Sequence, residues 1–249
     1  MQLKQLTNLK NIFFFVVLIS ISSEVFATNA KMLLPVDQAH QDPTFFSFRT
    51  KLISTIKQRD IKAFESVLDK NIQVPDGSGI GIESFKHFWH YNDKNSPFWD
   101  ELLNVLLNGG VFKGLNSSES YFWAPYYNVL LPDEYVQNYG VIYKKRTFLR
   151  NSPLANGTII KALSYDIVKL PDSSDRTYPS LTPVFTNRKN IKQWVKVCTL
   201  DGCKGYVLNS AIATPANSFC VGFLKEGENG APKETGKWVM ISFGSSQDD

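Results

Sequence analysis

The stretches that decide the fold lie near the C-terminus: Phe219-Cys220-Val221-Gly222-Phe223-Leu224 and Lys237-Trp238-Val239-Met240-Ile241-Ser242-Phe243. In the first stretch Phe219, Val221 and Phe223 recur at every second position, which is typical of a β-strand with one buried face. The second stretch also supplies apolar faces, and a loop containing Gly and Glu joins the two, so we expect a hairpin. Because a lone hairpin is only marginally stable in water, another layer must cover its apolar face.

The region before residue 108 is the expected cover. Apolar residues at three- and four-residue steps predict a helix over Phe45–Ile56, and shorter stripes predict further helices after Asp60, Ile82 and Ser96. This region contains little strand pattern of its own. Helices and an antiparallel sheet each bury one face against the other. We therefore expect residues 44–138 and 214–249 to form one discontinuous α+β domain.

Between these two parts, the pattern changes to short strands separated by turn residues. The expected strands are Val141–Tyr143, Thr147–Arg150, Thr158–Leu163, Tyr165–Leu170, Trp194–Val197 and Lys204–Leu208. Asp201-Gly202 between the last two is a strong hairpin signal. Short strands with long early loops and a tight late hairpin suggest a small β-barrel.

Several pieces of this region resemble the bacterial SH3-like (SH3b) domain. The pieces are Leu149-Arg150-Asn151-Ser152-Pro153, Thr158–Leu163, Trp194-Val195-Lys196-Val197, the Asp201-Gly202 turn, and Lys204-Gly205-Tyr206-Val207 with Ala211-Ile212. With Phe98-Trp99-Asp100-Glu101-Leu102 and Phe122-Trp123-Ala124-Pro125-Tyr126, the whole chain resembles secreted bacterial SH3 domain-containing proteins of uncertain function. The resemblance implies a small SH3-like β-barrel, residues 139–213, inserted into the α+β domain.

The N-terminus has the pattern of an export signal. Residues 1–11 carry Lys4 and Lys10 and no acid, residues 12–21 are apolar, and Val25-Phe26-Ala27 fits a cleavage site. An apolar run of this length is too short to span a hydrocarbon core of ~30 Å. We predict a signal peptide over residues 1–27, cleaved near Ala27, a flexible leader over residues 28–43, and a periplasmic or secreted mature chain without a transmembrane segment. The alternative is an uncleaved membrane anchor.

Composition excludes some classes of function. The chain has 249 residues, of which 43% are hydrophobic and 20% charged, as in ordinary globular proteins. The net charge is +4, from 27 basic and 23 acidic residues, and we take this mild excess to be spread along the chain. Because nucleic-acid binders concentrate basic residues far more, we expect no nucleic-acid partner.

The resemblance also indicates a recognition surface. SH3-like domains of exported bacterial proteins often bind cell-wall peptide or another protein, so it implies peptidoglycan or an envelope protein as partner, without a cofactor. If the usual aromatic face is used, the ligand-binding residues are Tyr143, Tyr165, Trp194 and Tyr206. Trp194 and Tyr206 could equally belong to the core. The prediction is an exported, non-enzymatic binding or scaffolding protein.

The alternative is a cell-envelope hydrolase with its site in the helical domain. Sugar hydrolysis needs two carboxylates, and Glu65, Asp100 and Glu101 are candidates, although each is also explained as a helix surface residue. On one helix, Glu83, His87 and His90 follow a spacing that can bind zinc. Three polar residues on the outer face of an amphipathic helix explain that spacing equally well.

The cysteines leave two possibilities open. Cys198 and Cys203 flank the Asp201-Gly202 turn, and an oxidising compartment favours a disulfide between them. With a four-residue loop the two side chains would be directly opposed, whereas a three-residue loop ending in Gly202 would turn them to opposite faces. All three cysteines lie outside the helical region, which disfavours a Cys–His peptidase.

Overall fold

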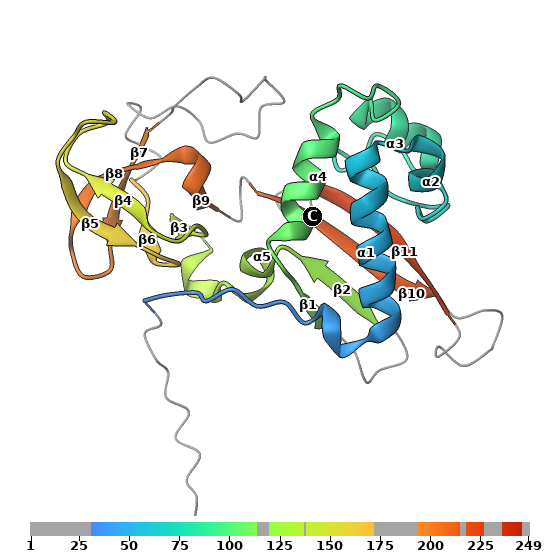
Figure 1. Ribbon diagram of the computed structural model, residues 1–249, viewed down its shortest axis with the longest axis horizontal. Coiled ribbons are helices and arrows are strands. Elements are labelled where there is room, and N and C mark those ends of the chain that lie inside the picture. Colours follow the sequence, from blue (N-terminus) through green and yellow to red (C-terminus); the bar gives the residue numbers. More distant parts are fainter. Residues whose placement is uncertain are drawn as a thin grey trace, which may run out of the picture.

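The computed structural model describes residues 31–113, 120–136, 138–171, 194–214, 218–226 and 236–245. It is a mixed α+β structure with five α-helices and two antiparallel sheets in these ranges, so the expected α+β class is confirmed (Figure 1). The predicted signal peptide, residues 1–27, lies outside the described residues. Of the helices that the structure describes, none has the length and apolarity needed to cross a bilayer.

The helices lie mostly in the first half of the chain. They are η1 (Ala39–Gln41), α1 (Pro43–Gln58), α2 (Ile61–Glu65), α3 (Ile82–Trp89), α4 (Phe98–Leu107), α5 (Tyr126–Leu130), η2 (Asp133–Tyr135) and η4 (Asn209–Ala211). Local signals define their ends. Asp42 caps α1 and Asp60 caps α2 through side-chain hydrogen bonds, and α1 ends where Arg59 adopts a left-handed conformation at φ 52°.

One sheet joins the middle of the chain to its C-terminal part. Its strands are β1 (Val111–Lys113), β2 (Tyr121–Ala124), β10 (Phe219–Glu226) and β11 (Lys237–Ser245), in the order β1-β2-β10-β11. Val221 pairs with Ala124 on one side and with Phe243 on the other. Helices α1 and α4 lie across one face of this four-stranded sheet (Figure 1). The C-terminal hairpin is thus part of the sheet that the N-terminal helices cover.

The intervening segment, residues 139–213, forms a second sheet. Its strands are β3 (Tyr139–Ile142), β4 (Thr147–Arg150), β5 (Ile159–Leu163), β6 (Ile167–Lys169), β7 (Trp194–Thr199), β8 (Lys204–Leu208) and β9 (Ile212–Ala213). The order is β5-β4-β8-β7-β6-β3-β9. This sheet has its own buried cluster: Ile142, Leu149, Leu163, Val168, Val195, Val197, Val207 and Ile212.

The expected closed barrel is not present in the described residues. Closure requires the two outermost strands to pair with each other. Here β9 is two residues long and pairs with β3, while β5 pairs with β4 at the opposite end of the order. The seven-stranded sheet therefore keeps two edges in the part of the chain that the structure describes.

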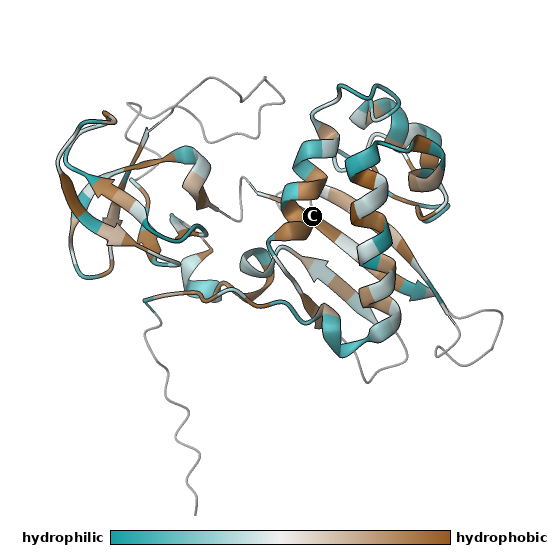
Figure 2. Ribbon diagram, in the orientation of Figure 1, coloured by the Kyte–Doolittle hydropathy of each residue, from teal (hydrophilic) through white to brown (hydrophobic). Residues whose placement is uncertain are grey.

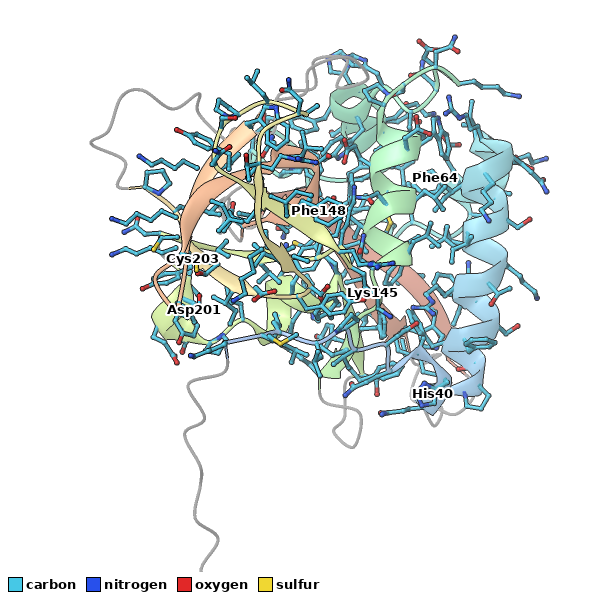
Figure 3. All side chains as sticks on the ribbon, turned by 60° about the vertical axis from the view of Figure 1, so that its left-hand side comes forward. His40, Phe64, Lys145, Phe148, Asp201 and Cys203 are labelled. Carbon is cyan, nitrogen blue, oxygen red and sulfur yellow. The ribbon has the colours of Figure 1, made fainter. Side chains whose placement is uncertain are left out.

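The segment before α1 differs from the expected flexible leader over residues 28–43. Between Lys31 and Asp42 it makes hydrogen bonds to both sheets: the Ile167 N–H donates to the Lys31 carbonyl oxygen at 2.9 Å, and the Gln38 N–H donates to the Gly110 carbonyl oxygen at 2.9 Å. The Asp37 carboxylate also accepts two hydrogen bonds from the Arg49 guanidinium, at 2.7 and 2.8 Å. Figure 3 shows His40 close to the start of α1. We call residues 31–42 the strap.

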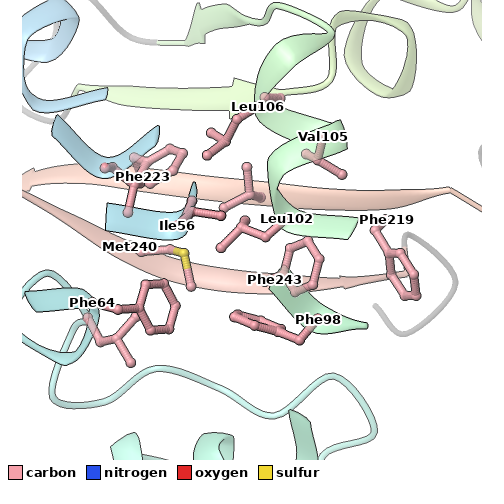
Figure 4. Packing of buried hydrophobic residues seen from close by; sticks show 14 of the residues in the cluster. Ile56, Phe64, Phe98, Leu102, Val105, Leu106, Phe219, Phe223, Met240 and Phe243 are labelled. Carbon is pink, nitrogen blue, oxygen red and sulfur yellow. The ribbon is translucent and has the colours of Figure 1, made fainter. Parts of the chain in front are cut away.

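The largest core lies between the helices and the four-stranded sheet. Ile56, Phe64, Phe98, Leu102, Phe223, Met240 and Phe243 are all fully buried there (Figure 4). The ring centroid of Phe243 lies 4.8 Å from that of Trp89 and 5.3 Å from that of Phe98. Figure 2 shows hydrophobic residues along α1, α4 and both strands of the hairpin, and buried residues of all four elements belong to one core cluster. Neither layer buries its apolar surface without the other.

Two leucines of α4 provide a matched test of this core. Leu102 is 0% exposed, whereas Leu107 is 61% exposed on the same helix. Leu102→Ala should lower the free energy of unfolding by about 3–5 kcal/mol because it leaves a cavity between helix and sheet. Leu107→Ala should change it by less than about 0.5 kcal/mol. Urea denaturation followed by tryptophan fluorescence measures both, and equal effects would contradict this packing.

Asp42 links the start of α1 to the hairpin. Its carboxylate accepts hydrogen bonds from the Thr44 N–H at 2.7 Å and the Phe45 N–H at 3.1 Å, and lies 3.3 Å from Lys225 Nζ. The Lys225 ammonium in turn lies 5.8 Å from the centroid of the Trp238 ring. Burial acts to raise the pKa of Asp42, but the hydrogen bonds from Thr44 and Phe45 and the charge of Lys225 outweigh it, so the pKa is lowered.

A lowered pKa means that the charged carboxylate stabilises the fold. This contribution is complete above the ordinary aspartate pKa of 3.8 and is lost as the pH falls through the lower pKa of the folded state. Asp42→Asn keeps a capping side chain but removes the charge, and should cost roughly 3 kcal/mol at about pH 7. The difference from the wild type should shrink as the pH is lowered from 3.8 through the lower pKa of the folded state, because Asp42 then becomes protonated in both states. A difference that stays constant in urea unfolding as the pH is lowered would refute the ion pair's role.

Candidate functional site: a cationic and aromatic pocket

A pocket of about 360 Å³ lies on the seven-stranded sheet. It is lined by Lys144, Lys145, Arg146, Thr147, Phe148, Arg150, Ala155, Trp194, Leu208, Ser210 and Ala211. This volume is in the range of pockets that hold small ligands or peptide side chains. The lining combines four cations with apolar and aromatic side chains and contains no carboxylate.

The turn between β3 and β4 carries three of the cations. The Tyr143 N–H donates to the Ala211 carbonyl oxygen at 3.2 Å, and the Tyr143 hydroxyl donates to the Ser210 carbonyl oxygen at 2.8 Å. Arg146 adopts a left-handed conformation at φ 55°, and its N–H donates to Ser164 Oγ at 2.9 Å. These bonds hold the turn against η4 and against Ser164 after β5, and Lys144, Lys145 and Arg146 line the pocket together.

The strands supply the apolar wall. Trp194 pairs with Leu208 across β7 and β8, and both line the pocket. On β4, the guanidinium carbon of Arg150 lies 5.7 Å from the centroid of the Phe148 ring, and Arg150 Nη1 donates to the Gly157 carbonyl oxygen at 2.5 Å. Figure 3 shows Lys145 and Phe148 in this part of the molecule. The Arg150 charge is thereby held beside an aromatic face.

Some cations of the described residues are paired with carboxylates. Lys161 pairs with Asp201 at 2.6 Å, and Arg59 pairs with Asp100 at 2.9 Å. The hydrogen bond from Lys161, followed by that from Thr199, lowers the pKa of Asp201 to about 2. None of the four pocket cations lies within ion-pair distance of a described carboxylate. The pocket therefore favours an anionic ligand.

The charge of the chain is also less evenly spread than we expected. The intervening segment, residues 139–213, contains 12 of the 27 basic residues but only four of the 23 acidic ones. Its net charge is therefore +8, while the rest of the chain carries −4. The whole-chain value of +4 conceals this difference because the two parts partly cancel.

Of the aromatic residues predicted to bind ligand, only Trp194 lines the pocket. Tyr143 fixes the adjacent turn, and its ring centroid lies 5.6 Å from that of Tyr127. Tyr165 adopts φ 64°, and its carbonyl oxygen accepts a hydrogen bond from the strap. Tyr206 pairs with Lys196 and with Arg150 and is not part of the lining. Of the four predicted residues, Tyr143, Tyr165 and Tyr206 therefore lie outside the lining of this pocket.

The sequence analysis missed the cations and Phe148. One signal was present, because Lys144-Lys145-Arg146 is the longest uninterrupted basic run in the chain. Spacing along the sequence does not show that β7, more than 40 residues later, brings Trp194 to the same pocket.

The candidate acids of the helical part lie on α2 and α4. Glu65 lies 2.7 Å from Lys86 Nζ and accepts a 3.4 Å hydrogen bond from the Tyr91 hydroxyl. Burial, followed by the nearby Glu65 charge, raises the pKa of Tyr91 well above its usual range. Asp100 pairs with Arg59, and Glu101 is half-buried on α4.

The proposed metal ligands do not form a complete site. Glu83 lies 3.1 Å from Lys86 Nζ, and the ring centroids of His87 and His90 lie 5.8 Å apart at the exposed end of α3. The described ranges contain no group of three or more His, Cys, Asp and Glu side chains arranged to hold a metal ion.

The disulfide between Cys198 and Cys203 is not present, since both thiols are free. The Thr199 N–H donates to the Cys203 carbonyl oxygen at 2.9 Å, and Cys198 pairs with Lys204, so the loop is Leu200-Asp201-Gly202 with Gly202 at φ 91°. This three-residue loop turns Cys203 toward the buried cluster, whereas Cys198 lies on the opposite face with Lys196. The two sulfur atoms therefore cannot bond.

Comparison with known proteins gives no match: no protein-family model, no curated protein and no solved structure is similar to this chain. The resemblance to the SH3-like domain therefore stays a prediction that rests on the quoted residues.

The loop geometry predicts the thiol content of the native protein. None of the three cysteines forms a disulfide, so the denatured, unreduced protein should react with three equivalents of a thiol reagent. The same count after reduction is the control. A single reactive thiol before reduction would show that Cys198 and Cys203 are bridged and that the loop has the other length.

Proposed function

We propose that this protein is an exported, non-enzymatic binding or scaffolding protein that recognises cell-wall peptide. The intervening segment, residues 139–213, is proposed as an SH3-like recognition module, and the helix-covered sheet as its frame. The observation that carries the proposal is the pocket that Trp194 lines together with Lys145, Arg146 and Arg150.

The chemistry of the pocket supports peptide recognition. Peptides of the bacterial cell wall carry free carboxylates beside short aliphatic side chains. Guanidinium and ammonium groups bind carboxylates through charge-assisted hydrogen bonds, and the rings of Trp194 and Phe148 offer apolar area to an aliphatic chain. A ligand that carries both carboxylates and aliphatic side chains therefore contacts both the cations and the aromatic rings of the lining.

Three further observations agree with this proposal. The pattern of residues 1–27 predicts export, which would bring the protein to the cell wall. The strands of the intervening segment follow the order expected from the SH3-like resemblance along the chain. Both ends of the segment return to the four-stranded sheet, at β2 and at β10, as expected for an inserted module.

The test is a pulldown of the purified protein with cell-wall sacculi, with muropeptide release measured in the same tube. We expect binding without release. Trp194→Ala should reduce the retained fraction about fivefold, because a tryptophan in a ligand pocket supplies much of the contact area.

Tyr165→Ala is the matched control, since Tyr165 lies between β5 and β6 of the same segment but not in the pocket. It should bind as the wild type does. Muropeptide release would favour the hydrolase alternative, and full retention of Trp194→Ala would show that the pocket is not the recognition site.

A further inference from the structure

The hairpin beside the pocket exposes several large apolar side chains. On β4 and β5 and in the turn that joins them, Phe148 is 43% exposed, Leu154 56%, Ile159 48% and Ile160 44%. These side chains belong to one hairpin, because β4 and β5 pair with each other from Thr147 to Arg150. Clustered exposed apolar residues mark interaction surfaces more often than single ones do.

The apolar surface and the cationic pocket are continuous. Phe148 belongs to both, since it lies on the hairpin and lines the pocket with Arg150 and Ala155. The described parts of the intervening segment carry eight basic residues and two acidic ones. Asp201, one of these acids, is paired with Lys161. Complementarity therefore requires an occupant that is negatively charged and also carries apolar side chains.

We propose that the pocket and the adjoining β4–β5 hairpin bind an acidic peptide whose carboxylates alternate with aliphatic side chains. The carboxylates contact Lys145, Arg146 and Arg150, and the aliphatic groups pack on Phe148 and Trp194. This inference deepens the proposed function and rests on it, because it names the ligand chemistry of the same site.

A phosphodiester polymer fits the observations less well. Such a polymer satisfies the cations as a peptide does, but it has no aliphatic side chains to cover Ile159, Ile160 and Leu154. Covering apolar surface contributes to affinity in proportion to the area removed from water. The exposed apolar side chains of the hairpin therefore favour a peptide ligand over a phosphodiester polymer.

Fluorescence anisotropy with defined probes tests the proposal on the purified full chain. The main probe is a labelled octapeptide of alternating Glu and Leu. The comparison probes are an octapeptide of alternating Glu and Ser, one of alternating Lys and Leu, and an oligothymidylate of matched charge. We expect the Glu–Leu peptide to bind most tightly, with an affinity that falls as salt is added.

Charge reversal at Lys145 has a matched control in the same sheet. Lys145→Glu should weaken binding of the Glu–Leu peptide about tenfold, because it places a like charge in the pocket. Lys169→Glu makes the same change in net charge at an exposed position of β6 outside the lining, and should alter the affinity less than about twofold. Lys145→Gln is a milder variant in case the reversal disturbs folding, and it should weaken binding in the same direction.

Four outcomes would overturn the inference. They are no binding of the Glu–Leu peptide, equal binding of the Glu–Ser peptide, tighter binding of the oligothymidylate, and equal effects of Lys145→Glu and Lys169→Glu. The sacculus pulldown separates this inference from the proposed function. If the Glu–Leu peptide binds but sacculi do not, the proposed cell-wall ligand is refuted and the acidic-peptide site is supported. If sacculi bind but the peptide does not, the acidic-peptide site is refuted and the proposed cell-wall ligand is supported.

Discussion

The apolar face of the β10–β11 hairpin and the apolar stripes of α1 and α4 cover each other, and the rest of the fold depends on this contact. Phe223, Met240 and Phe243 are fully buried against residues that precede them by more than 100 positions. The cost of closing so long a loop grows only with the logarithm of its length, and the buried aromatic and aliphatic area offsets it. Once the contact forms, both ends of the intervening segment are held at the same sheet.

This arrangement explains how the backbone around the pocket is held in place. The seven-stranded sheet has its own core, and the strap connects it to the helical part through Lys31 and Gln38. Within the sheet, Tyr143 ties the cationic turn to η4. A site whose backbone is already fixed loses less conformational entropy when a ligand binds.

The division of charge follows the division of the chain into two sheets. The intervening segment is strongly basic, whereas the remaining residues are acidic overall. In the helical part, described cations such as Lys86 and Arg59 are paired with carboxylates. In the pocket, Lys145, Arg146 and Arg150 have no carboxylate within ion-pair distance among the described residues. Cations beside exposed apolar side chains complement a ligand that is anionic and also carries apolar groups, which is why we assign a ligand to this surface.

The sequence by itself determined the helices and strands, because apolar residues that recur every two or every 3.6 positions form a pattern among neighbouring residues. It also determined that another layer must pack on the apolar face of the hairpin. Only the tertiary structure decided which groups meet at the pocket, since Trp194 and Lys145 come together through strand order and not through spacing. The strap shows the same limit. Its polar sequence suggested a flexible leader, but Asp37 accepts a hydrogen bond from Arg49, and main-chain groups of the strap form hydrogen bonds with both sheets. Cys198 and Cys203 were left undecided for a similar reason. Loop length is set by the register of β7 and β8, and one residue of register moves a side chain to the other face.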